Sequence, residues 1–350
     1  MLNYNMKHFF MEDSALYPLK FYPLFKNKIW GGNKIKTDLG IDYSPLANCG
    51  EMWILSGVDG NESMVENGFL AENNLNEVLE IYNADLIGEA NYARFGNEFP
   101  LLIKIIDAND RLSVQVHPDD ANARRQGLGN GKTEMWYIMD AEKNSIIIDG
   151  FSKKMTVESY QKSLADGTLV DSLNAVHPDK GDVFFIPGGR VHAIGKGILL
   201  AEVQQTSDTT YRIYDWNRTD DQGNSRELHT AQALEVLDFS KVGAVKTNYS
   251  YTKNATSKIV ECPYFTTSLL AFDRPVKKDF AALDSFVAYC CLEGICAVRA
   301  LNTIVPMRAG ECILVPAIAD TVEIFPEREA KVLEVYIDNT KIDTPQSQLQ

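Results

Sequence analysis

Short stretches that alternate apolar and polar residues, or that are wholly apolar, run through most of this 350-residue chain. Gly, Pro, Asn and Asp separate these stretches, which is typical of β-strands joined by turns. Helical periodicity is confined to three segments, near Leu75 to Asn83, Thr156 to Asp166 and Thr230 to Leu237. The pattern therefore predicts a mainly β fold with a few short helices.

The stretch from Gly181 to His192, GDVFFIPGGRVH, combines a strand, a turn and a candidate metal ligand. Asp182 to Ile186 predicts a hydrophobic strand that leads into a Pro-Gly-Gly sequence. Because proline fixes φ and glycine permits positive φ, we expect the chain to reverse there and to present His192 on the next strand. The spacing Gly-x5-Pro-x-Gly-x2-His is similar to the second motif of the cupin superfamily.

A second candidate strand, Leu112 to Asp120, alternates polar and apolar residues. Successive side chains of a strand point to opposite faces, so Ser113, Gln115 and His117 should share one face. Gln115 and His117 therefore form a pair of candidate ligands that point the same way.

A third candidate strand runs from Gly131 to Ile138 and places Lys132, Glu134 and Trp136 on one face. Glu134 is the remaining candidate ligand. One Gln, two His and one Glu make a mixed nitrogen and oxygen set that suits Zn²⁺, with a position left for water or substrate. Other divalent ions also fit this set.

Three further histidines, His8, His177 and His229, lack such company. His8 lies near the N-terminus, His177 lies in a loop before a proline, and His229 lies where a helix should begin, so we expect surface or structural roles for them. A lone histidine is more often a hydrogen-bonded, partly buried residue than a ligand. The metal prediction therefore depends on several polar side chains converging, because unpaired buried polar groups are costly.

Three motifs together make the chain similar to the type I mannose-6-phosphate isomerases (phosphomannose isomerases), a zinc-dependent cupin family. They are LSVQVHPDD, GKTEMWY and the Pro-Gly-Gly-x-x-His turn. The resemblance extends to residues 22–32, 50–53, 99–104 and 210–216, so that it covers roughly residues 17 to 340 and is greatest to the shorter bacterial members. It implies zinc ligands at Gln115, His117, Glu134 and His192, the set reached from strand alternation.

The resemblance also implies roles for residues around the metal. Ser113, Lys104 and Lys132 would lie around the substrate phosphate or the reacting end, and Glu202 and Arg212 would line the pocket. Arg212 could stabilise enediolate charge, because a guanidinium stays protonated. The implied reaction is the reversible conversion of mannose 6-phosphate to fructose 6-phosphate through an enediol, which needs a proton carrier. Glu202 or Lys132 is our first choice for this role, and a zinc-bound water or the histidine ligands acting indirectly are the alternatives. Without the resemblance, a solvated lysine is the plainer explanation of Lys104.

Other functions share parts of this pattern. A cupin glucose-6-phosphate isomerase, or another sugar-phosphate isomerase, would use a similar pocket, and strand alternation does not distinguish C2 epimers. A sugar sensor would keep the fold but would need no proton carrier. An iron-dependent dioxygenase is disfavoured because Gln115 stands where the general cupin motif has its first histidine, which favours a Lewis-acid metal.

The charge balance and the cysteines narrow the class of protein further. With 34 basic and 48 acidic residues the net charge is −14, which argues against nucleic acid or an anionic membrane as a partner, so a phosphate must be bound by local cations. The six cysteines lack metal-finger spacing and show no disulfide framework. No run approaches about 18 apolar residues. We expect a cytoplasmic enzyme, monomeric or homodimeric, acting on a small sugar phosphate.

A partial repeat predicts a second domain. Gly310 to Pro316 repeats the Gly-x5-Pro spacing, but Ile318 and Thr321 stand where Gly189 and His192 stand in the first copy. The predicted fold is two cupin (jelly-roll) β-barrel domains. A catalytic domain would span residues 17–255, with a small helical insertion at 152–180, and a metal-free domain would span residues 256–345.

Overall fold

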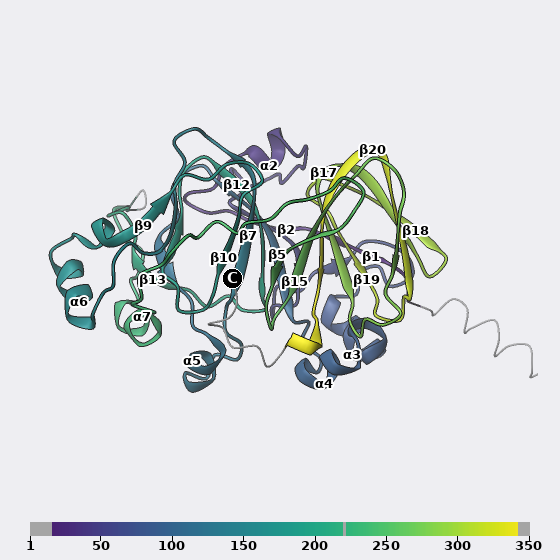
Figure 1. The fold of residues 1–350 in the computed structure, drawn as a ribbon, viewed down its shortest axis with the longest axis horizontal. Helices are drawn as coiled ribbons and strands as arrows, with labels where there is room; N and C mark the ends of the chain where they lie inside the picture. The colour runs from purple at the N-terminus through teal and green to yellow at the C-terminus, as the bar shows by residue number, and fades with distance from the viewer. Residues whose placement is uncertain (1–15, 220–221, 342–350) are drawn as a thin grey trace, which may run out of the picture.

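The computed structural model describes residues 16–219 and 222–341 and is mainly β (Figure 1), which confirms the predicted fold class. Three sheets follow one another along the longest axis of the molecule, with a six-stranded sheet between a five-stranded and a nine-stranded one. His8 and the last predicted residues of the C-terminal domain lie outside the described residues.

Within each sheet, neighbouring strands come from distant parts of the chain. From one edge to the other, the six-stranded sheet contains β10 (Val183–Ile186), β7 (Glu134–Ala141), β12 (Ile198–Gln205), β5 (Leu101–Ala108), β3 (Glu51–Ser56) and β2 (Leu24–Lys26). The five-stranded sheet contains β13 (Tyr211–Tyr214), β6 (Val114–Val116), β11 (His192–Ile194), β8 (Ile147–Phe151) and β9 (Leu173–Val176). The nine-stranded sheet contains β14 (Ser257–Glu261), β15 (Thr266–Phe272), β20 (Thr321–Tyr336), β17 (Val287–Ala300), β19 (Cys312–Val315), β1 (Leu19–Tyr22) and β4 (Met64–Val65), with β16 (Val276–Asp279) on β20 and β18 (Thr303–Arg308) on β17.

The helices are short and lie around the sheets. They are α2 (Lys34–Thr37), α3 (Leu75–Ile87), α4 (Glu89–Phe95), α5 (Asp120–Arg125), α6 (Val157–Ala165) and α7 (Thr230–Val236), with 3-10 turns η1 (Leu169–Ser172) and η2 (Asn339–Lys341). The three predicted helical segments correspond to α3, α6 and α7. Two of these helices begin with capping boxes, in which Asn74 and Thr156 each accept a hydrogen bond from the backbone three residues on.

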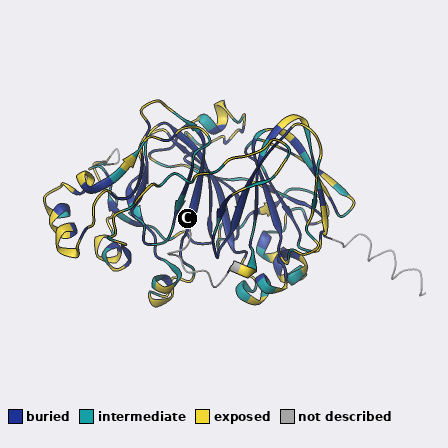
Figure 2. Ribbon diagram, viewed as in Figure 1, coloured by how far each residue is buried: buried dark blue, intermediate teal, exposed yellow. Residues whose placement is uncertain are grey.

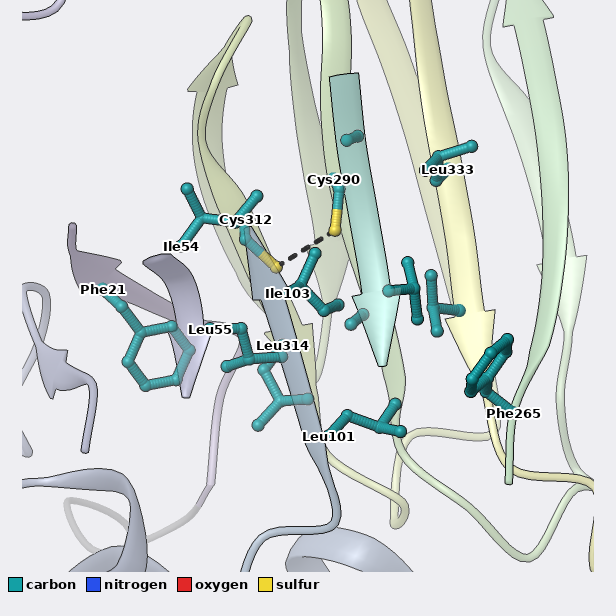
Figure 3. Packing of buried hydrophobic residues seen from close by; sticks show 14 of the residues in the cluster. Phe21, Ile54, Leu55, Leu101, Ile103, Phe265, Cys290, Cys312, Leu314 and Leu333 are labelled. Atoms are coloured by element: carbon teal, nitrogen blue, oxygen red, sulfur yellow. Dashed lines mark hydrogen bonds between the residues drawn. The ribbon is translucent and has the colours of Figure 1, made fainter. Parts of the chain in front are cut away.

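The six-stranded sheet is buried on both faces, and every residue of β5 and β12 is buried. Ile103 and Ile105 lie on one face of β5 and belong to the same hydrophobic cluster as Leu314 and Leu333 of the nine-stranded sheet. Figure 3 shows Ile103, Leu314 and Leu333 within this cluster. Burial is correspondingly concentrated in the strands, while the helices and loops carry most of the exposed residues (Figure 2).

The opposite face of the six-stranded sheet packs on the five-stranded sheet. Ile106, Trp136 and Leu200 from the six-stranded sheet contact a cluster that includes Ile147 and Ile194 from the five-stranded one. Polar residues continue these same inward-facing rows and form the candidate site. The face of the six-stranded sheet that packs on the five-stranded sheet therefore carries both apolar core residues and the polar residues of the candidate site.

The outer face of the five-stranded sheet is covered by α6, η1 and α7, which contribute Tyr160, Leu169 and Ala233 to its core. Residues 152–180, predicted as a helical insertion, contain α6 and η1 and then a strand, β9, that pairs with β8. The prediction missed this four-residue strand.

The nine-stranded sheet contains strands from both ends of the described chain. β1 pairs with β19 and with β4, so Leu19 lies opposite Leu314 and Phe21 lies opposite Val65. The predicted division of the chain near residue 255 stays a prediction, as does the cupin assignment. The predicted strand and turn near Pro316 are present, because β19 ends at Val315 and β20 begins at Thr321.

All six cysteines are buried free thiols, at positions 49, 262, 290, 291, 296 and 312. Cys290 and Cys312 lie opposite each other on β17 and β19, with their sulfur atoms 3.5 Å apart. Within the described ranges, no helix combines the length and apolar character needed to cross a bilayer. The cytoplasmic location and the oligomeric state stay predictions.

Candidate metal centre and substrate pocket

The five-stranded sheet brings three predicted site residues into one row. Gln115 on β6 lies directly opposite His192 on β11 and, on its other side, opposite Arg212 on β13. Residues directly opposite each other in antiparallel strands project to the same face. His117 follows Gln115 by two residues, so it lies on this face as well.

The six-stranded sheet supplies a facing row. Glu202 on β12 lies opposite Lys104 on β5 and Trp136 on β7, and the next row places Gln204 opposite Glu134. The two sheets therefore turn their candidate ligands toward each other.

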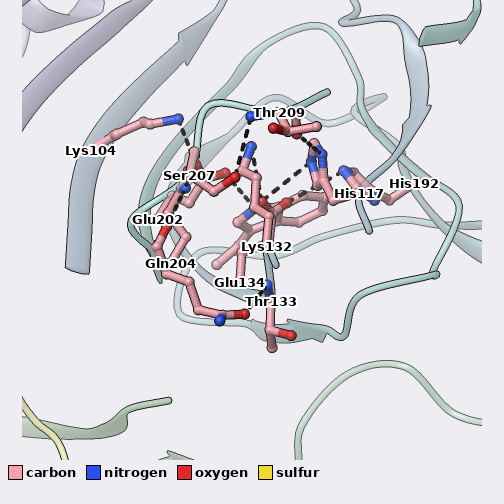
Figure 4. A network of polar contacts seen from close by, with 12 residues as sticks. Lys104, His117, Lys132, Thr133, Glu134, His192, Glu202, Gln204, Ser207 and Thr209 are labelled. Atoms are coloured by element: carbon pink, nitrogen blue, oxygen red, sulfur yellow. Dashed lines mark hydrogen bonds and ion pairs between the residues drawn. The ribbon is translucent and has the colours of Figure 1, made fainter. Parts of the chain in front are cut away.

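His117, Glu134 and His192 converge, and among the described residues they are the one group of His, Cys, Asp and Glu side chains found close enough to hold a metal ion. Their ligand atoms all lie within 4.8 Å of one another (Figure 4). The Nε2 atoms of His117 and His192 are 3.5 Å and 3.4 Å from the Glu134 carboxylate oxygens. All three side chains are buried, and none of these four atoms has a hydrogen-bond partner. Two imidazole nitrogens and two carboxylate oxygens, buried without hydrogen-bond partners, are suited to bind a divalent cation.

Backbone carbonyls fix the orientation of both imidazoles. Nδ1 of His117 is 2.9 Å from the carbonyl oxygen of Thr209, and Nδ1 of His192 is 2.8 Å from that of Arg190. A carbonyl only accepts, so each Nδ1 carries the proton and each Nε2 keeps a free lone pair. This is the tautomer that a metal at Nε2 requires.

Burial shifts the pKa values of the same three candidate ligands. Burial lowers the pKa of His117 well below its ordinary value, with Lys132 adding to the effect, and burial lowers the pKa of His192 to about 3. Both rings are therefore neutral. Burial also raises the pKa of Glu134 to about 8, with the charge of Glu202 adding and Lys132 opposing. A buried carboxylate in this setting is stabilised by a bound cation.

A pocket of about 290 Å³ opens next to these ligands. Its walls include the remaining predicted site residues, namely Lys104, Ser113, Gln115, Lys132, Glu202 and Arg212. Five cationic and three acidic side chains line it, so this pocket is locally cationic in a chain whose net charge is −14. An anionic substrate is therefore attracted to the pocket although the whole protein repels it.

Gln115 lines the pocket and lies opposite His192, which places it beside the three converging ligands. Its role as a fourth ligand stays a prediction. Lys132 bridges the pocket and the ligands, because its Nζ is 3.4 Å from a Glu134 oxygen.

Lys104 is only 4% exposed, so the solvated lysine considered for this position is wrong. Its Nζ is 3.2 Å from Glu202 and 3.9 Å from Glu51. Burial opposes the charge, but the two carboxylates outweigh it and raise the pKa of Lys104 above its ordinary value. The indole nitrogen of Trp136 donates a 2.9 Å hydrogen bond to the other Glu202 oxygen, which holds that carboxylate in place.

Several residues line the pocket for which the sequence predicted no role. They are Lys28, Trp30, Glu51, Asp208, Thr210 and Arg226. Glu51 and Trp53 are two residues apart on β3, so strand alternation alone could have predicted that their side chains share a face. The others come from loops whose path no periodicity predicts. Arg226 is held by Asp215, which accepts hydrogen bonds of 2.8 Å and 2.6 Å from it.

His177 and His229, the two other histidines within residues 16–219 and 222–341, do not join the centre. His229 directly precedes α7, as expected, and its Nδ1 accepts a 3.2 Å hydrogen bond from the backbone nitrogen of Arg212. His177 contacts the carbonyl oxygen of Ser145 through its Nδ1 at 3.0 Å. Both contacts are structural, in agreement with the prediction for these two residues.

Fold and site together define a mainly β protein with a buried candidate metal centre beside a cationic pocket. Comparison with known proteins shows which family of such proteins the chain is similar to. The catalytic domain of type I phosphomannose isomerase matches residues 19–156. The mannose-6-phosphate isomerase of Streptococcus mutans is 40% identical over 71% of this chain and 77% of its own length. Mannose-6-phosphate isomerase ManA of Bacillus subtilis is 36% identical over 85% of this chain and 93% of its own length.

The crystal structure of the mannose 6-phosphate isomerase from Bacillus subtilis superposes with a TM-score of 0.82 at 29% identity, and the match covers 92% of this chain and all of that one. The chain therefore belongs to the type I phosphomannose isomerase family, a family of enzymes. The resemblance found in the motifs is confirmed.

Proposed function

We propose that this protein is a zinc-dependent aldose-ketose isomerase that interconverts mannose 6-phosphate and fructose 6-phosphate through an enediol. The observation that carries the proposal is the convergence of two neutral imidazoles and a carboxylate beside a cationic pocket, with four buried atoms that have no hydrogen-bond partner. The names of the relatives support the choice of substrate.

A bound zinc ion would be held by Gln115, His117, Glu134 and His192, and would supply a Lewis acid for the sugar oxygens. The residues around it supply the remaining functions. Ser113, Lys104 and Lys132 would bind the phosphate or the reacting end of the sugar. Because Lys104 is already paired with two carboxylates, we place it at the reacting end, where it holds Glu202.

Arg212 is the residue that we expect to stabilise negative charge developing on the sugar oxygens. Its Nη1 donates to the carbonyl oxygen of Glu227 at 2.8 Å, while its buried Nε has no hydrogen-bond partner. The Nη1 hydrogen bond holds the guanidinium in place, and the Nε–H remains available to donate to a substrate oxygen. A fixed donor aimed at developing charge is among the most effective catalytic devices of enzymes.

Glu202 is our first choice for the proton carrier, and Lys132 is the alternative. The reaction removes the proton from C2 of the aldose and returns it to C1, so one side chain that reaches both carbons is sufficient. Glu202 is 3% exposed and lines the pocket, and its carboxylate is held by Trp136. The Nζ atom of Lys132 is 3.4 Å from a Glu134 oxygen, so Lys132 would instead compensate the negative charge of this metal ligand.

The central experiment measures conversion of mannose 6-phosphate by the purified full-length protein before and after chelation, with glucose 6-phosphate as the comparison substrate. We expect fructose 6-phosphate to form from mannose 6-phosphate, the activity to disappear with the chelator, and added Zn²⁺ to restore it. Activity that resists complete removal of metal would contradict the metal role. Turnover confined to glucose 6-phosphate would contradict the substrate assignment.

A second experiment tests the proton carrier. Glu202→Gln should retain bound zinc but lose exchange of the C2 hydrogen with deuterated solvent. Lys132→Met provides the comparison, since it should keep the exchange if Glu202 carries the proton. Unchanged exchange in Glu202→Gln would remove that residue from the role.

A further inference from the structure

Asp149 is a fully buried carboxylate on β8 for which the proposed reaction has no use. Its Oδ1 accepts a 2.8 Å hydrogen bond from Nη1 of Arg190, and its Oδ2 has no hydrogen-bond partner. Removing two charges from water costs about as much free energy as their attraction returns, so a buried ion pair adds little net stability to a fold. The Asp149–Arg190 pair therefore calls for an explanation beyond general stability.

Arg190 connects this carboxylate to a candidate metal ligand. It lies two residues before His192, and its carbonyl oxygen accepts the 2.8 Å hydrogen bond from the His192 ring. In the β8–β11 pairing, His192 lies directly opposite Asp149. Arg190 therefore holds the imidazole through its backbone and is itself held through its side chain by the neighbouring strand.

The same turn also contacts the other histidine. The backbone nitrogen of Gly189 donates to the carbonyl oxygen of His117 at 2.8 Å, and the backbone nitrogen of Gly150 donates to the carbonyl oxygen of Val191 at 2.7 Å. The turn from 187 to 191 is thus hydrogen-bonded to the backbone of His117, to the ring of His192 and to the backbone of β8. A displacement of this turn would move both imidazoles relative to Glu134.

We infer that Asp149 and Arg190 act as a positioning pair that anchors the 187–191 turn and so keeps the Nε2 atoms of His117 and His192 directed at one ion. The inference rests on the proposed metal centre and extends it by a layer of residues that touch neither metal nor substrate. Groups that orient metal ligands typically change metal affinity by about 10-fold to 100-fold when they are removed. The negative charge of Asp149 also compensates the cation of Arg190 beside a site that binds a cation.

The test compares the full-length protein with Asp149→Asn and Arg190→Gln. The dissociation constant for Zn²⁺ is measured by competition with a chelator, and the absorption spectrum of the Co²⁺-loaded protein reports the ligand geometry. We expect both substitutions to weaken Zn²⁺ binding by about tenfold or more and to alter the Co²⁺ spectrum. Arg190→Lys keeps the cation and should restore part of the affinity.

Glu334→Gln is the matched control, because Glu334 is a buried carboxylate that accepts a 3.0 Å hydrogen bond from Lys278 in the nine-stranded sheet. It should lower the thermal midpoint of the metal-free protein without changing Zn²⁺ affinity. If Asp149→Asn behaves in the same way, the pair is only structural and the inference is overturned. If the unsubstituted protein itself fails to bind Zn²⁺ or Co²⁺, the proposed metal centre is wrong, and the inference falls with it.

Discussion

The carboxylate of Glu51 provides a measurable test of how the pocket holds its charges. Burial alone would raise the pKa of Glu51, but Lys104 and Lys28 outweigh burial and lower it from the ordinary 4.5 to about 2. Lys28 lies 3.1 Å from one carboxylate oxygen, and the Trp53 indole donates a 2.8 Å hydrogen bond to the other. The side chain is 13% exposed, so solvent screens these contacts only partly.

The lowered pKa sets the sign of the effect on stability. A carboxyl whose pKa is lower in the folded protein than in the unfolded chain stabilises the fold above the unfolded value, and the contribution is lost as the pH falls. With values of 4.5 and about 2, this contribution amounts to about 3 kcal/mol at neutral pH, since each pKa unit corresponds to about 1.4 kcal/mol. About 2 kcal/mol of it should be lost on going from neutral pH to about pH 3.

The assay is urea unfolding of the unsubstituted protein and of Glu51→Gln between pH 7 and pH 3. The difference in free energy of unfolding between the two proteins should shrink as the pH falls, and it should vary less in a Lys104→Met background. Glu142→Gln, at a side chain that is 60% exposed, is the control and should have little effect at any pH. A difference between unsubstituted protein and Glu51→Gln that stays constant over this range would refute the electrostatic account.

Three further predictions address the reacting end, the turn and the core. Arg212→Met should lower kcat by roughly 100-fold or more while metal analysis shows zinc unchanged, and an unchanged kcat would remove Arg212 from the reaction. Gly188→Ala places a Cβ 2.7 Å from the Asp119 Cα, so it should weaken Zn²⁺ binding in a chelator competition, whereas Gly243→Ala meets nothing within 4 Å and should leave it unchanged. Leu314→Ala should lower the free energy of unfolding in urea by about 2–5 kcal/mol, and a much smaller loss would show that the core between the sheets collapses around the gap.

The convergence of the candidate ligands was predictable because each lies on a short strand with clear alternation or directly after a turn with restricted backbone. Gln115 and His117 share a face by period alone, and the Pro-Gly-Gly sequence required a reversal before His192. The structure adds the register, in which Gln115 pairs directly with His192. Register depends on contacts between distant strands, so no local pattern predicts it.

The burial of Lys104 was not predictable from its own strand. A lysine among apolar residues can extend to solvent, and only the partners decide whether it stays inside. Those partners, Glu51 and Glu202, lie on strands far away in the sequence. The pairing of β1 with β19 is similarly hidden, because a four-residue strand carries no sign of which sheet it joins.

The two buried faces of the six-stranded sheet limit how far the protein can be shortened. A chain cut at residue 255 would keep every proposed ligand but would lose Leu314 and Leu333, which cover Ile103 and Ile105. Those isoleucines flank Lys104 along β5, so the strand that carries this pocket cation would present a bare hydrophobic surface to water. A minimal catalyst made from the N-terminal part would therefore need a redesigned polar exterior on this sheet before it could be expected to remain monodisperse.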